Sequence, residues 1–140
     1  MTEPTVADLT ALALNCTLTP SPDASSTELL LAQVMTALAS HGVTGDIVRV
    51  VDFDVRPGVQ TDMGGGDEWP SIRERVLASD IVIVGTPIWM GHMSSIAQRV
   101  LERLDAELSE TDDAGRPILF DKVAAVAVVG WVLLNRTTFG

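Results

Sequence analysis

The chain has 140 residues, of which 46% are hydrophobic, and its 9 Lys and Arg against 19 Asp and Glu give a formal net charge of −10. This length predicts a single domain over residues 1–140, and the apolar content excludes a disordered chain. The acidic excess argues against binding to nucleic acid or to an anionic membrane surface, and a single Cys excludes a disulfide framework.

The sequence also predicts a location and the absence of a metal site. The first five residues are polar and lack the basic-then-apolar pattern of a signal peptide. The longest apolar stretch, residues 123–134, is too short to cross a bilayer. We therefore expect a cytoplasmic protein. Two histidines and one cysteine leave no predicted metal site.

The first predicted strand is the apolar run at residues 9–15, which a polar loop with prolines follows. Ser25 and Glu28 form a capping-box pattern, which predicts a helix that begins at Ser25. Apolar residues recur at helical spacing as far as Leu38, and Gly42 is placed to end this helix.

Two further strands enclose a long polar stretch. A second strand is predicted at residues 46–51, and the third, residues 80–85, is nearly all β-branched and apolar, as in a strand buried on both faces. Between them, residues 52–69 include three consecutive glycines, which indicates a mobile excursion or a short linker. Pro70 favours the first turn of a helix that ends near Ser79.

A loop is predicted at residues 86–93, followed by a helix that Ser94 or Ser95 caps and whose apolar face extends to Leu108. After a turn-rich connection, residues 122–129 predict a fourth buried strand. Strands that alternate with helices predict a three-layer α/β domain with a parallel sheet and right-handed crossovers.

Ligands of open parallel sheets bind beyond the carboxyl ends of the strands, where two loops are expected here. The first, residues 16–27, is rich in hydroxyls and leads into a helix N-terminus, whose free N–H groups favour a phosphate. It contains Asp23 but no Lys or Arg, and it lacks the glycine patterns of triphosphate and dinucleotide loops. These features favour a monophosphate, although a capped helix after an ordinary surface loop explains the same residues.

The second loop, residues 86–93, combines a turn with large apolar side chains. Pro87 is expected to force a turn after the strand, and Gly91 permits the close approach of a ligand. Trp89 in this loop can cover a planar ligand, with Met90 and Met93 as adaptable apolar contacts. The alternative is that Trp89 packs beneath its own loop.

Together the two loops resemble a known family. The segment NCTLT at residues 15–19, with SST at 25–27, resembles the phosphate loop of flavodoxin-like proteins. The segment TPIWMG at residues 86–91, with the serines that follow it, resembles the isoalloxazine-binding loop of the NADPH-dependent FMN reductases. The resemblance implies a flavodoxin-like fold, FMN as the cofactor, and electron transfer from NAD(P)H to a flavin or quinone. The residues that it implies for the FMN phosphate are Thr17, Thr19, Ser25, Ser26 and Thr27, and those for the flavin ring are Pro87, Ile88, Trp89, Met90 and Gly91.

The same resemblance implies that the flavin carries the hydride chemistry, so no side-chain acid or base is required. Backbone N–H groups of residues 88–92 are expected near flavin N5 or O4. His92 is a candidate donor to the flavin or substrate, although an exposed loop histidine is the simpler interpretation. Cys16 is a candidate redox group, although a small buried side chain that fills space is again simpler.

The chain departs from the family at Cys16, where a glycine is common, and after the fourth predicted strand. The family sheet has five strands in the order 2-1-3-4-5, and a fifth strand with its helices would need roughly 40–60 residues, more than residues 130–140 provide. We therefore expect the order 2-1-3-4, with the fifth strand and last helices missing and an atypical tail. The fourth strand becomes a sheet edge, which predicts a homo-oligomer that pairs through residues 123–139.

Three functions remain open at this point. The first is an FMN-binding oxidoreductase that passes electrons from NAD(P)H to a small-molecule acceptor. The second is a flavodoxin-type electron carrier, which NADPH alone would not bleach. The third is a cofactor-free interaction module derived from the same fold, which would not bind FMN. A receiver domain is set aside because no paired acids follow the first strand.

Overall fold

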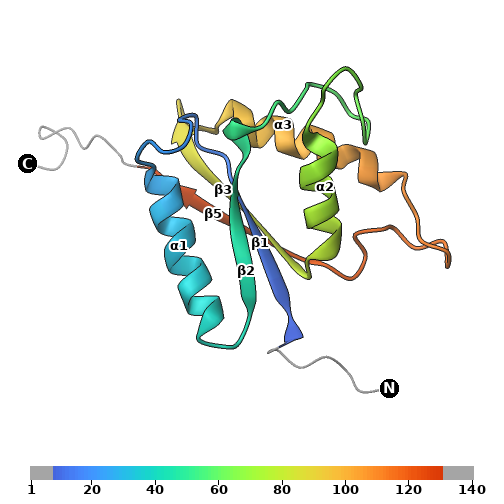
Figure 1. The fold of residues 1–140 in the computed structure, drawn as a ribbon, viewed down its shortest axis with the longest axis horizontal. Coiled ribbons are helices and arrows are strands. Elements are labelled where there is room, and N and C mark those ends of the chain that lie inside the picture. Colours follow the sequence, from blue (N-terminus) through green and yellow to red (C-terminus); the bar gives the residue numbers. More distant parts are fainter. Residues whose placement is uncertain (1–7, 131–140) are drawn as a thin grey trace, which may run out of the picture.

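A parallel β-sheet forms the centre of the molecule in the computed structural model, which describes residues 8–130 (Figure 1). Four strands pair in the order β2-β1-β3-β5, and the short strand β4 pairs antiparallel with the end of β3. This order confirms the predicted 2-1-3-4 arrangement, since β5 is the fourth parallel strand. The strands are β1 Thr10–Asn15, β2 Thr44–Arg49, β3 Ile81–Trp89, β4 His92–Met93 and β5 Val123–Val129. Residues 131–140, with most of the predicted tail, lie outside the described residues.

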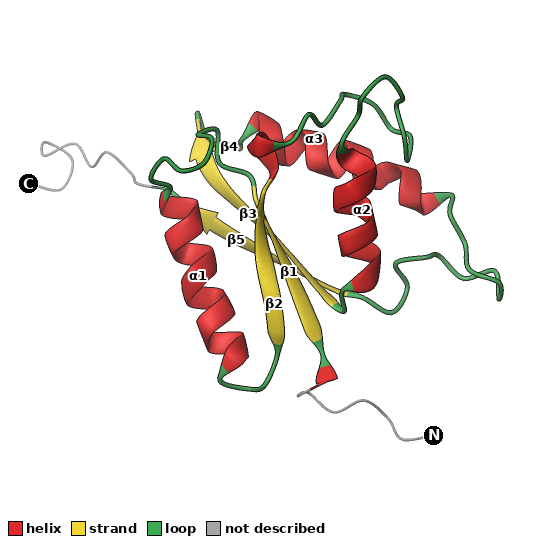
Figure 2. Cartoon of the chain, viewed as in Figure 1, coloured by secondary structure: helices red, strands yellow, loops and turns green. Residues whose placement is uncertain are grey.

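Helices cover both faces of the sheet, which confirms the predicted three layers (Figure 2). Helix α1 packs on one face, where Leu31 contacts Ala13, and helices α2 and α3 pack on the other, over Leu12 and Leu14. Neighbouring strand residues point to opposite faces, so β1 supplies both cores. Within residues 8–130, no helix is both long and apolar enough to cross a membrane. The helices are α1 Ser26–Ala39, α2 Trp69–Ala78 and α3 Ser95–Leu104, with 3-10 helices at Val50–Asp52 and Asp105–Leu108.

Serine side chains cap two of the helices. The Ser25 hydroxyl accepts a hydrogen bond from the backbone N–H of Glu28, and the Ser94 hydroxyl accepts one from Ala97, so both predicted helix starts are confirmed. The end of α3 differs from the prediction. The α-helix stops at Leu104 and a 3-10 helix follows, so Leu108 leaves the apolar face and is exposed.

Strand β3 extends further than predicted, and the loop expected at residues 86–93 is mostly a β-hairpin. Pro87 does not force a turn, because it lies within β3 and pairs in register with Val129. On the β1 side of β3 the pairing ends at Gly85, so no residue of β1 lies opposite Pro87. The missing N–H of Pro87 therefore leaves no carbonyl of β1 without a donor. The chain turns at Met90 and Gly91, whose φ angles are 52° and 75°, and returns as β4. Two residues at positive φ suit the twist of a two-residue hairpin.

Strand β5 is exposed, not buried as the sequence predicted. Val123, Val126 and Val128 are 60%, 70% and 51% exposed. Among the described residues, β5 pairs only with β3, so its other edge is free of strand partners. On the face shared with α3, two adjoining apolar cavities of about 350 and 220 Å³ lie along β5 and share Val84, Leu101 and Val126. The apolar sequence of β5 is therefore not sufficient to bury this strand.

The glycine-containing segment at residues 53–68 is anchored by a buried arginine of α3, in contrast to the expected mobile excursion or linker. The Arg103 guanidinium pairs with the Asp67 carboxylate at 2.7 Å, and both side chains are 0% exposed. Arg103 also donates to the backbone carbonyls of Arg56 and Gln60. It lies 5.6 Å from the ring centroid of Trp69, which begins α2. These bonds fasten the segment to the core.

Candidate functional site

The loop at residues 16–27, called the phosphate loop after its predicted ligand, leaves β1 at the carboxyl edge of the sheet and enters α1 (Figure 1). The backbone N–H of Thr17 donates to the Asn15 side chain at 3.0 Å, and the hydroxyls of Thr17 and Thr19 lie 3.2 Å apart. Asn15 also donates to the Glu28 carboxylate at 2.7 Å, so Glu28 ties the helix to β1. The structure thus brings these two predicted hydroxyls together just beyond the strand.

The remaining predicted phosphate residues surround the first turn of α1. Ser25 is the N-cap, Ser26 is exposed and Thr27 is buried, with 1% of its surface exposed. The first N–H groups of a helix have no intrahelical acceptor, and the cap hydroxyl satisfies only that of Glu28. The N–H groups of Ser26 and Thr27 have no hydrogen-bond acceptor among the described residues, so an anion at this turn can accept from them, and of the two residues only Ser26 is exposed.

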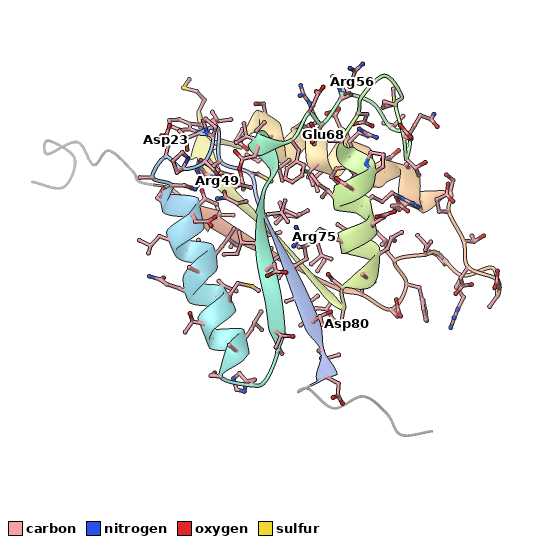
Figure 3. The ribbon with its side chains drawn as sticks, viewed as in Figure 1. Asp23, Arg49, Arg56, Glu68, Arg75 and Asp80 are labelled. Carbon is pink, nitrogen blue, oxygen red and sulfur yellow. The ribbon has the colours of Figure 1, made fainter. Side chains whose placement is uncertain are left out.

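Two residues of β2 and of the turn after it fasten this loop, and the sequence did not identify them. Arg49 donates through Nη1 to the carbonyls of Asp23 at 2.8 Å and Thr19 at 3.3 Å. Asp52 accepts from the Ser21 backbone N–H at 2.8 Å and from its hydroxyl at 2.5 Å. The bonds from Ser21, and to a smaller extent the charge of Arg49, lower the pKa of Asp52. Figure 3 shows Arg49 beside Asp23 at this edge.

The position of Arg49 at the end of a predicted strand could have identified it as a neighbour of the phosphate loop. It lies in register with Asn15 at the end of a neighbouring parallel strand, so both residues reach the same sheet edge. It also follows Ile47 by two residues, and Ile47 packs toward α1, which places Arg49 on the α1 face. Residues 16–27 themselves contain no Lys or Arg, so the sequence of the loop gives no sign of this cation.

The two predicted loops lie against each other. The Ser94 hydroxyl donates to the carbonyl of Cys16 at 2.6 Å, and the Ser94 N–H donates to the hydroxyl of Thr86 at 3.0 Å. The Cys16 N–H in turn donates to the carbonyl of Gly85 at 2.8 Å. These buried bonds among Cys16, Gly85, Thr86 and Ser94 join the start of the phosphate loop to the β3–β4 hairpin, residues 86–93, and are called the seam below.

The hairpin presents its large apolar side chains to solvent. Ile88, Trp89 and Met90 are 46%, 56% and 102% exposed, so Trp89 does not pack beneath its own loop. A Cβ added at Gly91 would meet nothing within 4 Å, which leaves this turn open to a ligand. Pro87 is half-buried. The cavity of about 350 Å³ beside the hairpin is lined by hairpin, α3 and β5 residues and by none of the phosphate loop.

Cys16 and His92 take their simpler interpretations. Cys16 is fully buried in the core beneath α2 and α3, and this burial raises the pKa of its thiol to about 12. A thiol in that state is inert, so a packing role is confirmed and a redox role is not supported. His92 is exposed at the hairpin, where its Nδ1 lies 3.0 Å from the carbonyl of Met93.

The donor set at the phosphate loop fits a phosphate monoester. It combines hydroxyls, helix N–H groups and a guanidinium on the neighbouring strand, and the apolar hairpin lies next to it. The family model of NADPH-dependent FMN reductases matches residues 10–134. The chain belongs to this family. Membership confirms the predicted flavodoxin-like fold, and the family implies FMN as the cofactor with NAD(P)H as electron donor.

Individual relatives agree with this assignment. An 8-demethyl-8-aminoriboflavin-5′-phosphate synthase of Streptomyces davaonensis is 31% identical over 131 residues, which cover 87% of this chain and 51% of that protein. The crystal structure of RosB with bound 8-demethyl-8-formylriboflavin-5′-phosphate superposes with a TM-score of 0.78 at 30% identity, over 87% of this chain and 52% of that one. An azoreductase from Bacillus anthracis, with a TM-score of 0.60 at 14% identity over 94% of this chain and 74% of its own, shows the fold alone.

A further relative is much longer than this chain. The divalent metal cation transporter MntH of Mycobacterium bovis is 36% identical over 126 residues, which cover 87% of this chain and 18% of that protein. The chain thus spans at most about half the length of the curated relatives that it matches.

Proposed function

We propose that this chain binds FMN at the carboxyl edge of its sheet and acts in an oxidoreductase that takes electrons from NADPH. The observation that supports this most directly is the seam at Cys16, where Ser94 joins the hydroxyl-rich phosphate loop to the apolar hairpin. FMN supplies the hydride chemistry when bound, so this chain has to hold and orient it. Family membership supports the same conclusion.

In this proposal the polar end of the flavin meets the phosphate loop. The hydroxyls of Thr17, Thr19 and Ser25 donate to phosphate oxygens, together with the backbone N–H groups of Ser26 and Thr27. The ring extends toward the hairpin, whose backbone N–H groups face flavin N5 or O4 and whose apolar residues exclude water from one side. The residues proposed along the ring are Pro87, Ile88, Trp89, Met90 and Gly91.

The proposed electron acceptor is a small planar molecule, a flavin or a quinone. Trp89 and Met90 are exposed at the hairpin tip, where they give such an acceptor an apolar surface for stacking. Both the donor and this class of acceptor are small molecules of the cell interior, which is why the cytoplasm is the proposed location.

A flavin titration tests the proposal. Purified protein should quench FMN fluorescence in the micromolar range, and anaerobic NADPH should bleach the bound flavin. Thr17→Val, which removes one donor at nearly constant shape, should weaken FMN binding severalfold, about the contribution of one hydrogen bond. Thr36→Val is the matched control, because that hydroxyl bonds only to Ala32 within α1. Absence of quenching by the unaltered chain would reject the proposal in favour of a cofactor-free module, and binding without bleaching would indicate a flavodoxin-type carrier.

The similarity to RosB favours a second candidate. That protein was crystallised with a riboflavin 5′-phosphate derivative as a bound intermediate, so there the flavin phosphate is a reactant. The same donor set would serve a flavin 5′-phosphate that is a substrate in this chain. Mass spectrometry of FMN recovered after turnover separates the two roles, since a cofactor returns chemically unchanged.

We also propose that the chain self-associates through β5. Within residues 8–130 one edge of β5 pairs with no strand, and this edge and the exposed valines offer a second copy both backbone hydrogen bonds and apolar contact. Light scattering should give a mass above that of one chain, and Val126→Lys, a charge on the exposed face, should give monomers. Thr36→Lys on exposed α1 is the control. A monomeric unaltered protein would contradict this proposal.

A further inference from the structure

The end of β2 contributes an anchor to the phosphate loop that no residue of the loop itself provides. We propose that Arg49 and Asp52 are positioning residues for the flavin phosphate. They hold residues 19–23 in shape, and Arg49 adds the positive charge that makes the site prefer FMN over unphosphorylated riboflavin. This inference rests on the proposed function of FMN binding.

These two residues form hydrogen bonds along the whole of one short turn. Asp52 accepts from the N–H and the hydroxyl of Ser21. Arg49 donates to the carbonyls of Thr19 and Asp23, which lie on either side of Ser21 in the sequence. Four hydrogen bonds from outside the loop therefore restrain five consecutive residues. Thr19 is one of the proposed phosphate donors, so this restraint fixes the backbone that carries a donor to the ligand. A preorganised loop loses less entropy when the ligand binds.

Arg49 forms no ion pair within residues 8–130. Its two hydrogen bonds go to backbone carbonyls, which are neutral acceptors. Asp52 accepts both of its hydrogen bonds from Ser21 and offsets only part of the Arg49 charge, which lowers the pKa of its carboxyl to a smaller extent than Ser21 does. Within residues 8–130, Arg49 is the one Lys or Arg side chain that bonds to this loop, and none lies in the loop's own sequence. The chain as a whole carries −10, so its average field repels a phosphate dianion. A local cation at the loop opposes that repulsion.

This arrangement predicts which flavins the site distinguishes. FMN and riboflavin share the ring and the ribityl chain and differ in the phosphate alone. Loss of the Arg49 charge should therefore weaken FMN and leave riboflavin nearly unchanged, and it should flatten the dependence of FMN binding on ionic strength. A purely structural role for Arg49 would instead weaken both flavins together.

Fluorescence titrations of FMN and riboflavin with Arg49→Met test the inference. We expect the Kd for FMN to rise about tenfold, equivalent to one charge-assisted interaction, while the Kd for riboflavin changes less than about twofold. Arg49→Lys keeps the charge but loses the guanidinium fork, so it should retain the salt dependence and recover part of the FMN affinity. Arg75→Met is the matched control, because it removes the same charge from α2 on the opposite face of the sheet (Figure 3). It should leave both constants unchanged.

The outcomes separate this inference from the function on which it rests. Equal FMN affinities for the unaltered chain and Arg49→Met would overturn the role of Arg49 and leave FMN binding intact. Equal losses for FMN and riboflavin would also overturn it, since they indicate a structural role. Failure of the unaltered chain to bind FMN would reject the proposed function and this inference with it. Thermal melting of each variant shows whether any loss reflects unfolding.

Discussion

Replacing Arg103 by Met should destabilise the protein by about 3–5 kcal/mol, the usual consequence of removing one partner from a buried ion pair. The guanidinium is fully buried and bonds to the Asp67 carboxylate and to the carbonyls of Arg56 and Gln60. Methionine fills much of the same space but leaves the carboxylate without a counter-charge and two carbonyls without a donor. A domain of this size has roughly 5–15 kcal/mol of stability in total, so the loss is large.

Urea denaturation followed by far-UV circular dichroism measures this effect at neutral pH. The control is Arg75→Met, which breaks an exposed pair with Asp46 at 3.3 Å and should change stability by less than about 0.5 kcal/mol. Limited proteolysis gives a second readout, because release of residues 53–68 should let the already exposed chain at residues 64–66 enter a protease active site and be cleaved faster. A loss below about 1 kcal/mol in Arg103→Met, within the range of surface pairs, would refute the assignment of Arg103 as the anchor of this segment.

The same pair predicts a pH dependence with a definite sign. Hydrogen bonds from Arg103, with smaller contributions from three backbone N–H groups, hold the pKa of Asp67 well below its ordinary value. A carboxyl whose folded pKa is depressed contributes stability that is fully present above its unfolded pKa of about 3.9 and is lost as the pH falls toward the folded value. The stability of the unaltered chain should therefore include the full contribution of Asp67 from neutral pH to about pH 5 and lose it only below about pH 4, which urea denaturation at a series of pH values measures.

Three further changes have defined outcomes. Cys16, with its buried thiol and raised pKa, should react with a thiol reagent at pH 8 only in denaturant; fast reaction of the native protein would contradict its burial. Met90→Gly should raise the free energy of unfolding measured in urea by about 1 kcal/mol, because Met90 has a positive φ and a fully exposed side chain. A decrease would show that this side chain has packing partners. Ser94→Ala should lower stability by about 2 kcal/mol, since it removes a helix cap and a buried bond to the Cys16 carbonyl. Ser95→Ala, one residue on and exposed, should change little, and equal losses in the two would refute the role of the seam.

Much of the fold was predictable because it depends on local patterns. The serine caps at Ser25 and Ser94, the apolar run of β1 and the β-branched start of β3 each specify an element by propensity and periodicity. Alternating elements then leave a parallel sheet as the main solution. Ligands of such sheets bind beyond the carboxyl ends of the strands, so the positions of β1 and β3 in the sequence are enough to predict both loops of the candidate site.

The features that the sequence did not determine all depend on which segments become neighbours. Pro87 signals a turn in isolation, but it lies in β3 because β1 has already ended beside it. The valines of β5 read as buried, yet a strand buries its faces only where other layers cover them, and β5 lies at the edge. The roles of Arg49 and Arg103 have no local signal in the sequence, since the hydrogen-bond partners of Arg49 are at least 26 residues away along the chain and those of Arg103 at least 36. Only packing of distant segments brings those partners within hydrogen-bonding distance, and with them the anchor of the long segment and the charge beside the phosphate loop.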